Sequence, residues 1–164
     1  MSDFFQTGII ATLHRLGKPD TEQLQAQLVP LSKKRPVALV LPSLVSECET
    51  PALDRIVSEL VQVPYLNEIV VSLDQADRKQ FEMAREFFSR LPQRHRIIWN
   101  DGPRLQAMYD VLRKNGLKIG EQGKGRGCWT AYGYVLSRGE SQVIALHDCD
   151  ILTYDREMLG RLVY

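Results

Sequence analysis

The chain has 164 residues, about the length of one domain, and its 44% apolar and 25% charged residues are typical of a soluble globular protein. With 21 basic against 20 acidic residues, the net charge of +1 favours neither nucleic acid nor an anionic membrane as a partner. No secretory signal pattern and no apolar run near the ~20 residues that span a bilayer is visible, and the three cysteines lack metal-ligand spacing. We therefore expect a cytoplasmic protein with reduced thiols and no membrane partner.

The first part of the chain is predicted to be helical. Apolar residues recur at helical spacing over residues 4–16, and Asp20 or Thr21 can cap a second helix that ends at Leu28, before Pro30. The polar run 32–36 is predicted to be a linker. Residues 1–36 are therefore interpreted as a helical lead-in to a main domain over residues 37–164.

Strands and helices then alternate along the chain. Apolar, β-branched runs predict strands at residues 37–41, 68–73, 96–99 and 143–146. Capping residues and apolar periodicity predict helices from Thr50-Pro51, from Asp77 to Leu91, and over residues 104–114, 128–137 and 154–163. This alternation predicts an α/β fold: a Rossmann-like, mostly parallel open sheet with helices on both faces.

Ligands of such sheets bind in the crevice beyond the carboxyl ends of the strands. Three segments follow predicted strands and should meet there: the loop from Pro42 to Glu47, the segment Ser72-Leu73-Asp74, and the triplet Asp148-Cys149-Asp150. Their convergence predicts a binding site at this edge of the sheet.

The carboxylates of Asp148 and Asp150 are candidate metal ligands. They are separated by one residue after a predicted strand, so strand alternation would place both on the same side. Two neighbouring carboxylates repel each other unless a cation lies between them, and Mg²⁺ or Mn²⁺ prefers such oxygen ligands. The alternative is a pair of solvated turn aspartates. His147 and Cys149, on the opposite side, are predicted to pack in the interior.

A glycine-rich segment, residues 116–127, precedes a predicted helix. It fails both the Walker pattern and the dinucleotide fingerprint, but Lys124 and the helix amides could meet an anion. The alternative is an exposed, mobile loop. Asp77 is predicted to be a helix cap, and Trp99 and Trp129 are predicted to be core residues.

The order of these motifs resembles the nucleotide-sugar half of GT-A-fold glycosyltransferases. A strand ends in Leu41-Pro42-Ser43-Leu44 with an acid at Glu47, a second strand ends in Ser72-Leu73-Asp74, and Gly123-Lys124-Gly125 precedes the Asp148-Cys149-Asp150 strand by about twenty residues. The resemblance is greatest to the glucosyl-3-phosphoglycerate synthase type, retaining enzymes near the large family-2 group, and it covers roughly residues 37–164.

The resemblance implies roles for individual residues. Pro42, Leu44 and an acid near Glu47 would frame the nucleoside, and Ser72 and Asp74 would contact the uracil or ribose. Lys124 would contact the nucleotide. The resemblance assigns Mg²⁺ or Mn²⁺, bound on the pyrophosphate, to Asp148 and Asp150, with Asp148 also counted among the nucleotide-sugar ligands. The family pattern has an asparagine before the first acid, where this chain has Val45, so which acid near Glu47 contacts the nucleoside stays open.

The implied reaction moves glucose from a nucleoside diphosphate sugar, UDP-glucose or GDP-glucose, to 3-phosphoglycerate with retention. In this family the acceptor site lies downstream of the Asp-x-Asp strand, so we expect a chain truncated after that motif, with no catalytic nucleophile and no activity alone. The alternatives are a nucleotidyltransferase with a similar sheet and cation, and a non-catalytic nucleotide-binding fragment. The oligomeric state stays open, with a homodimer as one option.

Overall fold

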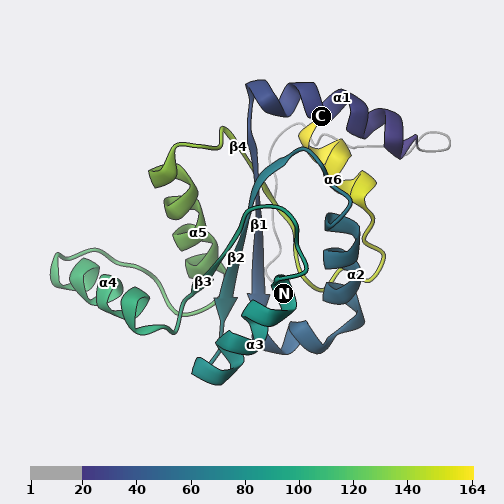
Figure 1. Ribbon diagram of the computed structural model, residues 1–164. Coiled ribbons are helices and arrows are strands. Elements are labelled where there is room, and N and C mark those ends of the chain that lie inside the picture. Colours follow the sequence, from purple (N-terminus) through teal and green to yellow (C-terminus); the bar gives the residue numbers. More distant parts are fainter. Residues whose placement is uncertain (1–19) are drawn as a thin grey trace, which may run out of the picture.

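A computed structural model describes residues 20–164 and places a four-stranded, fully parallel sheet at the centre of the chain (Figure 1). The strands lie in the order β3-β2-β1-β4. The predicted α/β fold with a Rossmann-like parallel sheet is confirmed. The elements, in chain order, are α1 (Thr21–Lys34), β1 (Val37–Leu44), the 3₁₀ helix η1 (Val45–Glu49), α2 (Pro51–Leu60), β2 (Leu66–Asp74), α3 (Arg78–Phe88), β3 (His95–Trp99), α4 (Pro103–Lys114), α5 (Lys124–Arg138), β4 (Val143–Leu146) and α6 (Arg156–Val163).

The strand β1 occupies the middle of the sheet because its residues are apolar on both faces. Residues 37–41 are all buried, as expected for a strand covered on two sides. The register pairs Pro42 with Ser72 and Leu44 with Asp74, so the carboxyl ends of β1 and β2 lie side by side. Pro42 is tolerated in the strand because β4 pairs with β1 only as far as Val40, and the missing N–H would point beyond the end of β4.

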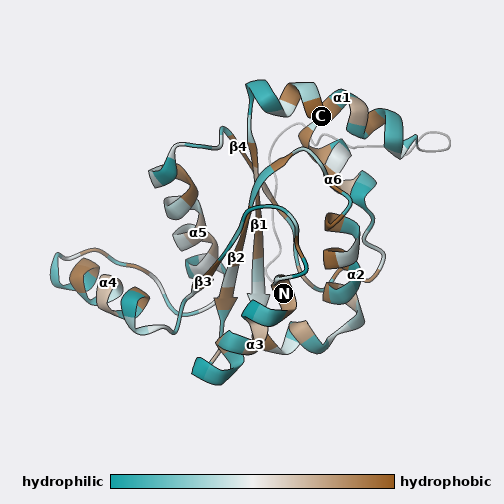
Figure 2. Ribbon diagram, viewed as in Figure 1, coloured by the Kyte–Doolittle hydropathy of each residue, from teal (hydrophilic) through white to brown (hydrophobic). Residues whose placement is uncertain are grey.

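Helices cover both faces of this sheet, and their apolar sides point inward (Figures 1 and 2). On one face, α2 packs Ile56 and Leu60 into a core that also contains Leu39 of β1 and Leu159 of α6. On the other face, α5 packs Ala131 and Val135 against Ala38, Val40 and Val70. The two central strands β1 and β2 are thereby buried on both faces.

Several boundaries differ from the sequence-based prediction. The helix α1 was expected to end before Pro30 but continues to Lys34, so residues 32–34 of the predicted linker are helical. Pro30 is exposed, so water can replace the hydrogen bond that its missing N–H would have made. The helix α5 was expected to begin at Cys128 and begins one turn earlier, at Lys124, because Gly123 adopts a φ of 149° and starts the helix there.

The first strand was expected to end at Leu41 but continues to Leu44, and α3 was expected to reach Leu91 but ends at Phe88. Three predicted helix starts are confirmed. Asp20, Thr50 and Asp77 cap α1, α2 and α3 with their side chains, and Pro51 occupies the first turn of α2. The helix predicted over residues 4–16 lies outside the described residues, and the division of the chain at residue 36 stays a prediction. None of the helices in residues 20–164 combines the length and apolarity needed to cross a membrane.

Candidate nucleotide-binding site

A pocket of about 310 Å³ lies at the carboxyl edge of the sheet, where four separate segments of the chain meet. This is the crevice in which ligands of parallel α/β sheets bind. All the predicted site residues except Ser72 line it. The lining residues are Pro42, Ser43, Leu44, Glu47, Asp74, Gln75, Gly123, Lys124, Asp148, Cys149 and Asp150.

The wall formed by β1 and η1 is fixed by a local hydrogen bond. The Leu44 backbone N–H donates to Glu47 Oε2 at 2.8 Å, which ties the carboxylate to the end of the strand. Leu44 itself is 38% exposed beside the pocket. Glu47 therefore has one oxygen engaged in building the loop, and its predicted contact with a nucleoside stays a prediction.

The end of β2 places a carboxylate of low exposure at the pocket. Asp74 is 5% exposed, and its Oδ1 atom has no hydrogen-bond partner among residues 20–164. Burial, with a further contribution from Asp101, raises the pKa of Asp74, while Arg126, Gln122 and Asn100 oppose the shift. Asp74 lines the pocket, and its buried, unpaired Oδ1 lacks the partner that a buried acceptor normally has.

Ser72 lies beneath the pocket and does not line it. Ser72 is 1% exposed, and its hydroxyl accepts a hydrogen bond from Asn100 Nδ2 at 2.8 Å. The structure thus places Ser72 next to Asp74 on β2 but one layer deeper, and its predicted contact with a nucleoside stays a prediction.

The first residue of α5 brings a cation to the pocket. Lys124 Nζ forms an ion pair with Asp148 Oδ1, and the hydrogen bond that Lys124 donates to Asp148 raises the pKa of Lys124. The two side chains are 57% and 45% exposed. Exposed ion pairs of this kind contribute about 0–1 kcal/mol to stability, so Lys124 can exchange Asp148 for another partner at little cost in free energy.

The residues after β4 alternate between the interior and the pocket. His147 is 5% exposed, with Nδ1 3.1 Å from the Tyr154 hydroxyl, and Cys149 is 1% exposed. Asp148 and Asp150 line the pocket. Both carboxylates were expected to share a side because the strand would continue through them, but the strand ends at Leu146, so this reason is wrong. Burial of His147 and Cys149 turns both carboxylates outward instead.

This arrangement can be tested for a divalent cation. Within residues 20–164, no three His, Cys, Asp or Glu side chains form a metal-binding group. Four carboxylates line the pocket, those of Glu47, Asp74, Asp148 and Asp150, and the Lys124 ammonium pairs with that of Asp148. Asp148 and Asp150 stay predicted ligands of Mg²⁺ or Mn²⁺, which would have to complete its shell with water and phosphate oxygens.

The two tryptophans behave differently from each other. Trp99 packs as predicted, stacked on Phe81 with ring centroids 4.7 Å apart, and donates a hydrogen bond to Ala76 O at 2.7 Å. Trp129 was predicted to be a core residue, which is wrong, because it is 53% exposed. It lies on the side of α5 away from the sheet-facing residues Ala131 and Val135.

A group of polar residues near the pocket was missed from the sequence. Asn100 and Asp101 were not among the predicted site residues, yet they follow β3 at the same edge of the sheet as the other strand ends. Asp101 Oδ2 accepts from the Ala76 N–H at 3.1 Å, and Oδ1 accepts from Gln122 Nε2 at 2.6 Å. The rule applied to the first, second and fourth strands could have found them.

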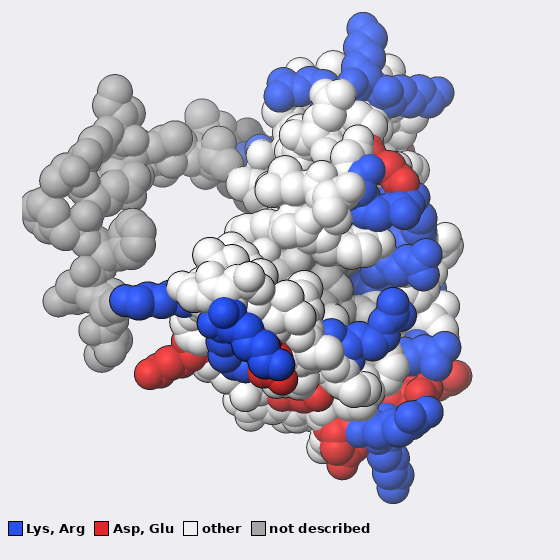
Figure 3. Space-filling view, turned by 90° about the vertical axis from the view of Figure 1, so that its left-hand side faces the viewer, with Lys and Arg blue, Asp and Glu red and all other residues white. Residues whose placement is uncertain are grey.

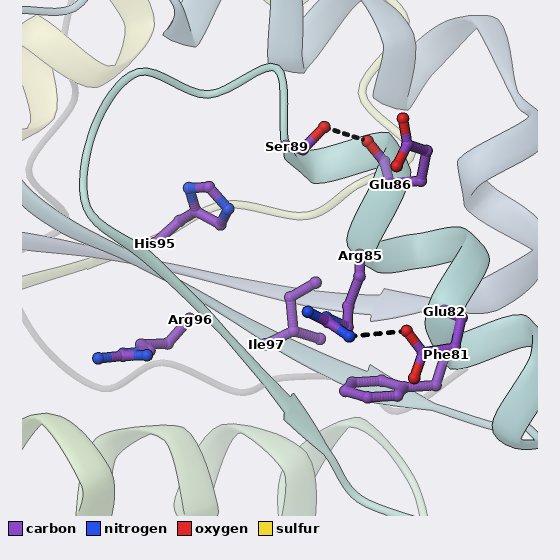
Figure 4. A pocket seen from close by; sticks show the side chains of 8 residues that line it. All are labelled: Phe81, Glu82, Arg85, Glu86, Ser89, His95, Arg96 and Ile97. Carbon is purple, nitrogen blue, oxygen red and sulfur yellow. Dashed lines mark hydrogen bonds and ion pairs between the residues drawn. The ribbon is translucent and has the colours of Figure 1, made fainter.

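A second pocket of about 510 Å³ lies between α3 and the edge strand β3 (Figure 4). Its wall includes an Arg85–Glu82 ion pair of 2.7 Å, and its floor comes from the body of β3 at residues 95–97. It does not gather the carboxyl ends of several strands.

On the face that includes α4 and α5, Asp and Glu side chains gather toward the lower end of the molecule, where the strands end (Figure 3).

Known proteins match this chain along its whole length. It is 43% identical over 164 residues to glucosyl-3-phosphoglycerate synthase of Persephonella marina, and 34% identical over 163 residues to the synthase of the same name from Methanococcoides burtonii. The predicted resemblance is confirmed. The chain spans 41% and 39% of the lengths of these two synthases, or about two fifths. No family model matches the chain.

Proposed function

We propose that this chain forms the donor-binding part of a glucosyl-3-phosphoglycerate synthase and holds a nucleoside diphosphate sugar in the pocket at the carboxyl edge of the sheet. The convergence of Asp74, Lys124, Asp148 and Asp150 on one pocket carries this proposal. The likeness to two synthases of that name supports the choice of reaction.

The proposed reaction transfers glucose from UDP-glucose or GDP-glucose to 3-phosphoglycerate. The bond between the anomeric carbon and the diphosphate oxygen breaks, and the diphosphate leaves with the electron pair. The acceptor hydroxyl oxygen forms the new bond to the anomeric carbon and loses its proton. Negative charge therefore develops on the leaving diphosphate, and groups that stabilise this charge lower the barrier.

The chain's own residues can meet these demands. Lys124 supplies a cationic donor for a diphosphate oxygen, for which it exchanges its exposed partner Asp148. Asp74 supplies a buried acceptor for the nucleoside, and Pro42 and Leu44 an apolar wall. Asp148 and Asp150 would hold Mg²⁺ or Mn²⁺, which when bound acts as a Lewis acid toward the diphosphate.

The role of Lys124 provides the test. Lys124→Ala removes a charge-assisted hydrogen bond to phosphate, worth roughly 1.5–3 kcal/mol, so we expect affinity for UDP or GDP to fall about tenfold to a hundredfold. Stability should change by less than ~0.5 kcal/mol because the side chain is exposed. Isothermal calorimetry measures the affinity, and thermal unfolding measures the stability.

Lys118→Ala is the matched control, because Lys118 is exposed and lies in the same loop without lining the pocket. Its affinity for UDP or GDP should equal that of the wild type. Unchanged affinity in Lys124→Ala would contradict the proposal. Tighter binding of nucleoside triphosphates than of diphosphates, with release of pyrophosphate from the triphosphate, would instead indicate a nucleotidyltransferase.

A further inference from the structure

A chain of buried polar side chains lies directly beneath the pocket and joins four elements of the fold. Asn100 Nδ2 donates to Ser72 Oγ at 2.8 Å, the Tyr109 hydroxyl lies 3.2 Å from Asn100 Oδ1, and the same hydroxyl lies 2.9 Å from Thr130 Oγ1. The four residues are 0–8% exposed. They connect β2, the turn after β3, α4 and α5 without reaching the surface.

Asn100 is the centre of this chain, since both its backbone and its side-chain polar groups have partners. Its N–H donates to Leu73 O at 3.0 Å, and its carbonyl accepts from Gln106 Nε2 at 2.7 Å. Buried amides with every group satisfied hold one orientation, because any rotation leaves a desolvated donor or acceptor. The Asn100 side chain is therefore fixed toward Ser72.

The first turns of α5 rest on this fixed surface. A Cβ atom added at Gly127 would lie 2.8 Å from Ser72 Oγ, 2.9 Å from Asp74 Oδ2 and 3.3 Å from Asn100 Nδ2. The helix backbone thus approaches as closely as a glycine permits. Lys124 stands one turn earlier on the same helix, so its position follows from the seating of Gly127 on this surface.

We infer that Asn100 is a positioning residue for donor binding: its buried amide, held by Tyr109, seats the first turn of α5 so that Lys124 and Asp74 face the same pocket. This inference rests on the proposed function for the ligand. The structural effect of Asn100 on α5 is independent of the proposed function, because it is measurable without any nucleotide.

The first measurement is amide hydrogen exchange in the free chain. Asn100→Ala should speed exchange of the α5 amides near residues 127–130 by about tenfold and leave the exchange rates of α2 (Pro51–Leu60) unchanged. The reason is that only α5 loses a packing contact in this variant. Tyr109→Phe removes the hydroxyl alone and should speed α5 exchange in the same direction but more weakly. It takes the place of Asn100→Ala if that variant does not fold. Exchange that is unchanged in α5, or faster in every element, would overturn the inference.

The second measurement is a double-mutant cycle on affinity for UDP or GDP, whichever binds more tightly. Asn100→Ala should weaken binding about five- to tenfold in the wild-type background and less than twofold in Lys124→Ala, because the effect passes through Lys124. Equal losses in both backgrounds would overturn the inference. A wild-type chain that binds neither nucleotide would contradict the proposed function, and hydrogen exchange would then decide on Asn100 alone. Asn115→Ala, an exposed amide at the far end of α4, is the control and should leave both readouts unchanged.

Discussion

Asp74 combines burial, a free acceptor oxygen and a neighbouring carboxylate, which together make it costly for the fold. Its pKa is raised by burial first and by Asp101 second. Arg126, Gln122 and Asn100 offset only part of this cost, and carboxylates with a raised pKa in a pocket are candidates for binding a ligand. At the scale of single residues, Asp74 is thus the group in which stability and binding are most clearly opposed.

Asp74→Asn should therefore raise stability and lower nucleotide affinity. The folded pKa of Asp74 lies above the unfolded value near 4, so the wild type loses stability as pH rises from that value through the folded pKa. The variant lacks this loss. We expect it to be more stable than the wild type at pH 7 and equal to the wild type below pH ~4, as measured by chemical denaturation.

Asp110→Asn is the control for this prediction, because Asp110 is exposed and should give the same stability as the wild type throughout. A stability gap for Asp74→Asn that is the same at every pH, or a loss of stability at pH 7, would show that the Asp74 carboxylate stabilises the fold.

Sequence predicted the pocket residues better than their surroundings. Residues at strand ends, such as Pro42 and Asp148, could be found because parallel strands deliver their carboxyl ends to one edge. Ser72 could be placed on β2 but not at its depth, which depends on Asn100 and α5. Depth below a surface is a tertiary property, and a strand's period of two does not encode it.

At the scale of elements, α5 shows two uses of glycine in one helix. Gly127 lies against Ser72 and Asp74, whereas a Cβ added at Gly133 would have no neighbour within 4 Å. The first glycine permits a close approach, and the second costs helix stability without an evident packing reason.

Gly127→Ala and Gly133→Ala should consequently change stability in opposite directions. The added methyl at residue 127 forces Ser72 or Asp74 to move and should cost roughly 1–3 kcal/mol of unfolding free energy. The same methyl at residue 133 should add about 1 kcal/mol through helix propensity. Denaturant midpoints of the two variants measure this, and a stabilised Gly127→Ala would refute the close packing described for α5.

Element boundaries that were wrong share a physical reason. Pro30 normally ends a helix, but an exposed position lets water satisfy the free carbonyl, and α1 continues. The start of α5 was placed late because several glycines disfavour a helix locally, whereas packing of Gly127 on β2 stabilises the first turn. Local helix propensity takes account of neither the access of solvent to the backbone nor the surface on which a helix packs.

At the scale of the whole molecule, the alternation of strands and helices was enough to predict a parallel sheet with two covered faces. Trp129 shows where that reasoning ends, because an aromatic on a helix can equally face the sheet or the surface. The arrangement of layers follows from pattern, while the direction of individual large side chains follows from packing.

We propose that Asp148 and Asp150 bind a divalent cation together with a nucleoside diphosphate. Two carboxylates cannot fill an octahedral shell, so the cation should bind weakly alone and more tightly when phosphate oxygens complete its coordination. Linkage requires the effect to be reciprocal: the factor by which Mn²⁺ raises nucleotide affinity equals the factor by which the nucleotide raises Mn²⁺ affinity.

The most direct measurement is calorimetric titration of UDP and GDP into this chain with and without Mn²⁺, in the wild type and in Asp150→Asn. We predict a coupling factor of about tenfold or more in the wild type that falls toward one in Asp150→Asn, with unchanged thermal stability. Glu49→Gln, which removes an exposed acid outside the pocket, should keep the wild-type factor. Nucleotide binding that is independent of Mn²⁺, or an unchanged coupling factor in Asp150→Asn, would contradict the account.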